Sequence, residues 1–225
     1  IVVKNDNLVS ERVVMTDEQQ MQFLNIAKHR YYNEVYQILL STGMRIGELT
    51  ALQWDDIDFE NKEIHIRHSM QSAYLNGKKI LNMTTPKTSN SIRDIPMFDG
   101  VEKLFVFWKE KQDKAKKELG RRWRLPKEFE NLVFTSSLGS PLTRYVLSND
   151  INKIVSILNK NEEYLAEQEN RVPKKFPKLH PHSFRHTFAT RCFEKNLKPV
   201  FIMSIMGHSN YETTLSYTHL LKKSN

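Results

Sequence analysis

The sequence predicts a mainly α-helical fold with a small antiparallel β-sheet, an α+β class. Apolar residues recur at helical spacing along most of the 225-residue chain. Between residues 62 and 97 they instead alternate with polar ones, which is typical of strands. Asn76-Gly77, inside that stretch, is a strong β-hairpin signal. The chain is long enough to bury a substantial core, as one large domain or two small ones.

Local start and stop signals place the first helices. Thr16 is a candidate N-cap, and Asp17 and Glu18 in the next turn favour the positive end of a helix dipole. The stretch 34–54 is expected to form two helices, because Gly43 suits the left-handed residue that ends a helix.

Three strand signals follow, and we expect them to form one small sheet inserted in the helical chain. They are KEIHIRHSM (62–70), the hairpin SAYLNGKKIL (72–81) and SIRDIPM (91–97). The segment TTPKTSN (84–90) connects the second signal to the third.

The second half of the chain returns to helical periodicity. A long helix is expected over 100–119, an extended segment over 131–136 and another helix over 141–160. Residues 160–178 are charged and contain two prolines, so we expect an exposed loop there. Three helical segments close the chain, near residues 182–195, 198–206 and 210–216, and Pro199 is expected in the first turn of the second.

Composition bounds the class of protein. The net charge of +8 and the pI near 9.4 fit a polyanionic partner, although a merely basic protein would look the same. The single cysteine, Cys192, excludes an internal disulfide, favours a reducing compartment and is expected to be a buried structural thiol. We find no long apolar run and no signal peptide, so a cytoplasmic location is expected. Since the chain begins with Ile1, we expect a fragment of a longer protein.

The segment HPHSFRHTFATR (180–191) has three possible interpretations: a metal site, a solvated helix face or an anion site. His182 and His186 are four residues apart, as in some zinc sites, but Arg185 beside them repels a divalent cation. His182 and Arg185, at i and i+3, lie on one helix face and can both donate to one phosphate. Taken alone, such a pair is more often structural.

Other segments offer compatible groups. Arg45 follows a glycine break at a predicted helix N-terminus, where the dipole favours an anion. His208 stands beside Gly207 at a predicted helix end, and Tyr217 lies nine residues further on. Lys87 falls in a strand connection, from which its flexible side chain can reach across a cleft. Each residue alone also fits an ordinary surface or core role.

The order of these motifs is more specific than any one of them. T-G-x-R-x-x-E-L (42–49), a lysine in a β-connection, H-x-x-R-H-T (182–187), G-H and a tyrosine together resemble the tyrosine recombinases, the phage integrase family. The resemblance runs from about residue 16 onward. HSFRHTFATR and IMGHSNYETTLSYTHL are most similar to integrases of conjugative transposons and temperate phages of Gram-positive bacteria. Phe184 departs from the pattern, because leucine is commoner at that position.

The resemblance implies a function, the cutting and rejoining of DNA strands in site-specific recombination. Tyr217 would attack a scissile phosphate, leaving a 3′-phosphotyrosine and a free 5′-hydroxyl. Arg45 and Arg185 would clamp the phosphate. His182 and His208 would hydrogen-bond the phosphate or assist proton transfer there. Lys87 would protonate the leaving 5′-oxygen. No metal, cofactor or ATP is expected. Glu48 is either a carboxylate that positions a cation or an ordinary surface residue.

The resemblance also implies an organisation. We expect residues 1–15 to be a linker or tail and residues 16–225 to be the catalytic domain, with arm-binding and core-binding domains absent from this chain. The expected partner is double-stranded DNA, bound in the bacterial nucleoid by a homotetramer with C-terminal contacts. An accessory excision factor is a further candidate partner. The candidate DNA-contacting residues are Thr143, Arg144, Lys174, Lys175 and Lys178. Thr143 is either a phosphate donor or the N-cap of the helix expected over 141–160. A type IB topoisomerase and a non-catalytic DNA-binding protein remain alternatives.

Overall fold

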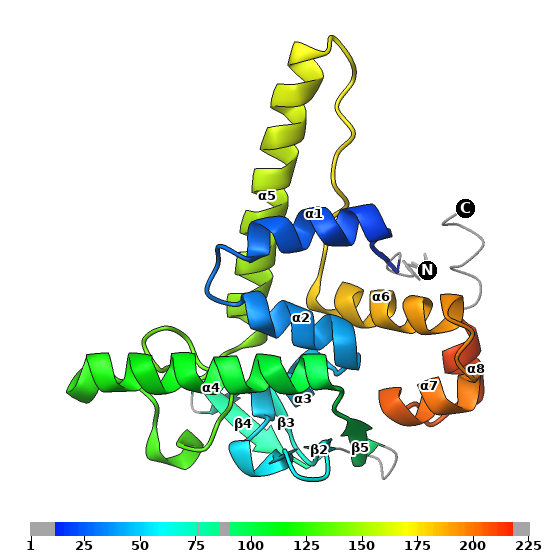
Figure 1. The fold of residues 1–225 in the computed structure, drawn as a ribbon. Helices are drawn as coiled ribbons and strands as arrows, with labels where there is room; N and C mark the ends of the chain where they lie inside the picture. Colours follow the sequence, from blue (N-terminus) through cyan, green and yellow to red (C-terminus); the bar gives the residue numbers. More distant parts are fainter. Residues whose placement is uncertain (1–11, 76, 86–90, 218–225) are drawn as a thin grey trace, which may run out of the picture.

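The computed structural model describes residues 12–75, 77–85 and 91–217, and it confirms the predicted mainly helical fold with small antiparallel sheets (Figure 1). The helices are α1 (Asp17–Ala27), α2 (Asn33–Thr42), α3 (Ile46–Ala51), α4 (Asp99–Leu119), α5 (Arg144–Gln168), α6 (Pro181–Glu194), α7 (Pro199–Met206) and α8 (Tyr211–Leu215). The strands are β1 (Ile57–Asp58), β2 (Glu63–Ile66), β3 (Ser69–Leu75), β4 (Lys78–Thr84) and β5 (Arg93–Pro96). Short 3₁₀ turns lie at Trp54–Asp56, Gly120–Arg122 and Lys127–Phe129.

The predicted helix signals act at the predicted places. The Thr16 hydroxyl accepts a hydrogen bond from the backbone N–H of Gln19, which completes a capping box at α1. Gly43 ends α2 in the left-handed conformation with φ 62°. Pro199 occupies the first turn of α7, where its missing N–H costs nothing.

The strands form two sheets rather than the single sheet that we expected. The antiparallel order β1-β2-β5 makes the first sheet, and β3-β4 makes a separate hairpin. The stretch 62–70 therefore holds parts of two strands instead of one. Burial explains the division: Ile64 and Ile66 enter the main core, whereas Met70 packs in a separate cluster with Ala51 and Leu132.

Helices α2 and α6 form the centre of the main core, and α2 also packs on α4 (Figure 1). Three buried aromatic rings join α1, α2 and α6: Phe184 stacks on Tyr36 at 5.5 Å and meets the edge of Phe23 at 5.3 Å. The phenylalanine at position 184, where leucine is commoner in the family, thus affects packing. Its ring anchors α6, the helix that carries the histidine–arginine motif.

Helix α5 is longer than expected, so the prediction of a loop over 160–178 is wrong as far as Gln168. Both prolines of that stretch lie beyond the helix, and the charged residues within it are good helix formers. Figure 1 shows the C-terminal part of α5 as an arm that projects from the other helices. Arg171, on the returning segment, pairs with Glu162 of α5 at 2.5 Å and helps hold that segment against the arm.

Two further expectations concern the cysteine and membrane-spanning helices. Cys192 is buried, as expected, and burial raises the pKa of its thiol to about 11. Across the described ranges, the helices lack the combination of length and apolar character needed to cross a bilayer.

Candidate active site

Arg45 caps the N-terminus of α3, directly after the left-handed turn at Gly43. Its guanidinium donates to a Glu48 carboxylate oxygen at 2.8 Å and to the carbonyl of Gly207 at 3.0 Å. The side chain remains 34% exposed, so its outer face can meet an anion. The predicted location of Arg45 at a helix start is therefore correct.

Glu48 is only 3% exposed, which excludes the interpretation as a surface carboxylate. Its two oxygens accept hydrogen bonds from the buried guanidinium of Arg93 on β5, at 3.0 and 2.8 Å. Burial alone would raise the pKa of Glu48, but the hydrogen bonds and charge of Arg93, together with Arg45, lower it to about 2. Glu48 is therefore a carboxylate anchor between two arginines.

Arg185 on α6 is almost fully buried and is held by backbone oxygens. It donates to the carbonyls of Gly43 at 2.7 Å and of Met206 at 2.6 Å. Burial, followed by the charge of Arg45, lowers its pKa to about 9. The guanidinium still carries its charge at neutral pH, and it lies without a carboxylate partner among the residues that the structure describes. Such a charge favours a bound anion.

His208 follows the left-handed residue Gly207 at the end of α7. Its Nδ1 lies 2.8 Å from the Thr214 hydroxyl, and its ring stacks parallel to the Tyr217 ring at 6.0 Å. Burial, with the charges of Arg185 and other arginines, lowers the pKa of His208 to about 3. The imidazole is thus neutral at neutral pH in the free protein.

Tyr217 follows α8 and is only 4% exposed. Its hydroxyl lies 3.1 Å from Nδ1 of His186. The Arg12 guanidinium stands 5.3 Å from the centre of the Tyr217 ring and donates to the neighbouring Ser216 hydroxyl at 2.5 Å. The N-terminal segment, α6 and the segment after α8 therefore meet at this tyrosine.

A groove of about 410 Å³ opens beside Arg45. Arg45 and His182 line it from α3 and α6, and Thr143 and Arg144 line it from the start of α5. The opposite wall is formed by residues 69–72 of the hairpin. Burial lowers the pKa of His182, and the charge of Arg144 adds to this effect, so the two side chains share one electrostatic environment. The groove suits an anionic chain.

Thr143 has a structural task at the groove. Its hydroxyl accepts from the backbone N–H of Val146 at 3.3 Å, so it is the N-cap of α5, one of its two expected roles. Arg144, next to it, is exposed.

The other predicted residues lie elsewhere. Lys174 and Lys175 line a separate cavity of about 710 Å³ between α1, α5 and the segment returning from the arm. Lys178 is exposed on the same segment, before α6. Lys87 lies outside the described residues.

Two residues near the site were missed by the sequence reasoning. Arg93 carried a signal, because it stands two residues before Ile95 in a half-buried strand. The two side chains therefore share the buried face, where a charged group is unusual. His186 was considered only as a metal ligand. It lies one helical turn after His182 and therefore on the same face, but its distance to Tyr217 depends on the tertiary fold.

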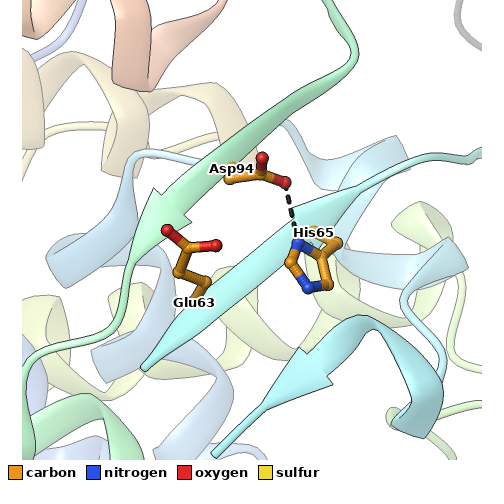
Figure 2. Close-up of side chains that lie close together, drawn as sticks. All are labelled: Glu63, His65 and Asp94. Carbon is orange, nitrogen blue, oxygen red and sulfur yellow. Dashed lines mark hydrogen bonds and ion pairs between the residues drawn. The ribbon is translucent and has the colours of Figure 1, made fainter. Parts of the chain in front are cut away.

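Within the residues that the structure describes, one group of three potential metal ligands lies close together, and it does not include the α6 histidines. The metal interpretation of His182 and His186 therefore gains no support from it. Glu63, His65 and Asp94 form it on the β2–β5 sheet (Figure 2). Asp94 already accepts from His65 at 2.7 Å and pairs with Arg67 at 2.6 Å. Within the group, His65 and Asp94 are therefore already engaged by a hydrogen bond and an ion pair, and Glu63 lies beside them on a partly exposed sheet face (Figure 2).

Known proteins share both the fold and the sequence family of this chain. The catalytic domain of bacteriophage HP1 integrase has the same fold, with a TM-score of 0.51 and 18% identity over 93% of this chain and 88% of that one. The Phage integrase family model matches residues 14–224, and the chain therefore belongs to the phage integrase family. The predicted resemblance is confirmed.

Individual relatives are also similar. The transposase from transposon Tn916 of Enterococcus faecalis is 31% identical over 92% of this chain and 47% of its own length. The ICEBs1 integrase of Bacillus subtilis is 29% identical over 84% and 45%. The Tn1549 transposon integrase in complex with circular intermediate DNA has a TM-score of 0.76 at 29% identity, over 94% of this chain and 63% of that one. The chain spans about half the length of these curated relatives.

Proposed function

We propose that this chain is the catalytic domain of a tyrosine-type DNA recombinase that integrates or excises a mobile element. It cuts and rejoins DNA strands through a covalent 3′-phosphotyrosine intermediate. The observation that carries the proposal is a cluster of four side chains, in which Tyr217 and His208 meet Arg45 and Arg185. Next to it lies the groove that Arg45 and His182 line. The names of the relatives, which are transposases and integrases, support the proposal.

The proposed reaction begins with attack of the Tyr217 oxygen on a scissile phosphate. Arg45 and Arg185 clamp its non-bridging oxygens, because fixed cations stabilise the negative charge that the transition state gathers. His182 and His208 hydrogen-bond the same phosphate. Backbone carbonyls hold both arginines, and Glu48 also holds Arg45. These contacts support the role, since they keep the charges in place before the substrate arrives.

The leaving 5′-oxygen needs a proton, and we propose Lys87 as its source. The covalent ester retains the bond energy, so rejoining needs no ATP. Arginine and histidine side chains supply the positive charge, and we therefore expect cleavage without a metal or any other cofactor.

Glu48 is proposed as the positioning residue of the arginines. Its buried contacts with Arg45 and Arg93 support this role. DNA contacts are proposed for Arg144, which lines the groove, and for Thr143, whose hydroxyl caps the adjacent helix. Lys174, Lys175 and Lys178 are proposed as outlying contacts with the DNA backbone.

The proposed partner is double-stranded DNA carrying a recombination site, within the bacterial nucleoid. Exchange between two duplexes requires four active sites, so we propose a homotetramer on DNA with C-terminal contacts, assisted by an excision factor. Residues 16–225 would form its catalytic domain and residues 1–15 a linker. The Tn1549 integrase, whose solved structure holds transposon DNA, supports the choice of partner.

A covalent-adduct assay tests the proposal. A pool of nicked duplexes of randomised sequence is incubated with the chain, and adducts are isolated under denaturing conditions. We expect adducts that persist in EDTA and disappear in Tyr217→Phe, while DNA binding is retained. Adducts that survive in Tyr217→Phe would refute the nucleophile assignment.

The same assay separates the two alternatives. Relaxation of supercoiled plasmid without joining of two sites would indicate a type IB topoisomerase. DNA binding without any adduct, also in protein extended at its N-terminus, would indicate a non-catalytic DNA-binding protein.

A further inference from the structure

His186 makes the closest contact with the tyrosine hydroxyl. It lies on α6, one turn beyond His182, and is partly buried. Its Nδ1 is 3.1 Å from the Tyr217 hydroxyl, and the two ring centres are 5.5 Å apart. This distance is within hydrogen-bond reach, which a general base requires.

The other two histidines are directed elsewhere. His208 presents its ring face to Tyr217, with the ring planes 3° apart, and its Nδ1 is committed to the Thr214 hydroxyl. His182 lines the groove, and its ring centre is 6.4 Å from that of His186. Among the histidines of the described chain, His186 is therefore the one whose ring nitrogen meets the nucleophile.

For the tyrosine hydroxyl to donate in this contact, Nδ1 must be unprotonated. The groups that face His186 are Tyr217 after α8, His182 and Arg185 on α6, and Arg12 on the N-terminal segment. Burial, followed by the charges of His182, Arg12 and Arg185, lowers the pKa of His186 to about 4. The free protein thus holds a neutral ring with an available lone pair at neutral pH.

We propose that His186 is the general base that accepts the proton of the Tyr217 hydroxyl during DNA cleavage. The proposal rests on the proposed function. As the Tyr217 oxygen–phosphorus bond forms, its O–H bond breaks and the proton moves to Nδ1 of His186. The bond from phosphorus to the 5′-oxygen breaks, and that oxygen takes a separate proton from Lys87. Rejoining reverses each step, and His186 returns its proton to the tyrosine.

DNA binding improves His186 as a base. The proposed clamp places the negative scissile phosphate next to Arg185, one of the cations that disfavour an imidazolium at His186. Partial neutralisation of this charge raises the pKa of His186 toward the operating pH. Proton acceptance by the ring is thereby favoured when the substrate is in place, and it is suppressed in the free protein.

Two substitutions separate proton transfer from simple positioning. His186→Asn places an acceptor oxygen near the position of Nδ1 but cannot take a proton, whereas His186→Ala removes both properties. His29→Asn, at an exposed histidine after α1, is the matched control. Each variant is tested in single-turnover cleavage of a nicked duplex selected from the randomised pool, across a range of pH, with DNA affinity measured in parallel.

We expect His186→Asn to bind DNA like the wild type and to cleave about 10²- to 10⁴-fold more slowly. The wild-type rate should rise with pH and level off, whereas the His186→Asn rate should keep rising with hydroxide concentration. Wild-type rate and pH profile in His186→Asn would overturn this inference and leave the proposed function intact. A wild-type chain that forms no Tyr217-dependent adduct would overturn both.

A measurement without DNA tests the geometry directly. Long-range ¹H–¹⁵N NMR spectra of the ¹⁵N-histidine-labelled chain report which ring nitrogen carries the proton. For His186 we expect protonated Nε2 and bare Nδ1, and a Tyr217→Phe variant should shift the Nδ1 resonance. A proton on Nδ1 at neutral pH would overturn the assignment of His186 as base.

Discussion

Arg93 and Glu48 form a buried two-point ion pair, in which both guanidinium nitrogens Nη1 and Nη2 meet carboxylate oxygens, at 3.0 and 2.8 Å. The Nε of Arg93 also donates to the carbonyl of Ile205 on α7. The same Glu48 carboxylate binds Arg45 of the groove. One buried acid thus connects β5, α3 and α7 and holds the exposed cation of the site.

Glu48→Gln should destabilise the fold strongly. The change keeps the shape but leaves the buried Arg93 without its counter-charge, which typically costs about 3–5 kcal/mol. Urea denaturation at neutral pH measures the loss in free energy of unfolding. The matched control is Glu102→Gln, which breaks an exposed pair with Lys62 and should cost at most about 1 kcal/mol. Equal losses in both variants would contradict the anchoring role.

Stability should also depend on acid through Glu48. Its pKa is about 2 in the fold and near 4.5 otherwise, so its ionised form stabilises the fold above about pH 4.5. This contribution is lost as pH falls from 4.5 toward 2, because the unfolded chain binds the proton first. Acid titration of the unfolding free energy should show this loss in the wild type. In Glu48→Gln the corresponding part of the slope should be missing.

The lowered pKa of His208 predicts a second pH range over which the free energy of unfolding changes. Its pKa falls from 6.5 to about 3 in the fold, mainly through burial, so the unfolded chain takes up a proton that the folded chain refuses. Stability is therefore complete above pH 6.5 and decreases as pH falls toward 3. Relative to wild type, His208→Gln should reduce the slope between pH 6 and 4 by about 1.4 kcal/mol per pH unit. Identical slopes in denaturation at several pH values would contradict this.

Gly43→Ala should destabilise the domain. Gly43 has φ 62°, and an added Cβ would lie 2.3 Å from Cδ1 of Phe188. Strain and overpacking together predict a loss of about 1–3 kcal/mol in thermal or urea unfolding. Gly100→Ala in α4 is the control, because its Cβ meets nothing within 4 Å. That change should raise stability by up to about 1 kcal/mol.

Arg12→Ala should loosen Tyr217. The cation–π contact at 5.3 Å is at an exposed arginine, so we expect a loss of about 0.5–1 kcal/mol, or roughly two- to five-fold faster opening. Hydrogen exchange of the Tyr217 amide, which bonds to the Thr214 carbonyl, measures this opening. Arg122→Ala, on the turn after α4, should leave the exchange rate unchanged. An effect of equal size in both variants would remove the special role of Arg12.

The helix boundaries were predictable where one residue carries the signal. Thr16, Gly43 and Pro199 each act through their own backbone or nearest turn, so their effects are visible without the rest of the fold. The two-residue strand β1 was not predictable in this way, because its pairing with β2 depends on tertiary position. The end of α5 was missed because a charged, proline-containing stretch was taken as one unit, although the prolines act only beyond the helix.

For the site, too, local sequence motifs were predictive and contacts made by the tertiary fold were not. The order of motifs drew attention to Arg45, Arg185, His208 and Tyr217, and the fold brings these residues together. No local pattern predicts that the Tyr217 hydroxyl meets His186, since the two residues belong to segments that are joined only by packing. Lys174 and Lys175 were selected for charge alone, and charge does not report which face of the fold a residue occupies.

The carbonyl oxygens of Gly43 and Gly207, each at the left-handed end of a helix, accept hydrogen bonds from Arg185 and Arg45. Every amino acid has such an oxygen, so no substitution can delete the acceptor itself. Mutational drift can therefore exchange most side chains around the two guanidinium groups while their anchors persist. What evolution must preserve is the chain's path through two tight turns. At each of them glycine holds the left-handed conformation that presents the carbonyl, and a residue with a Cβ would strain it.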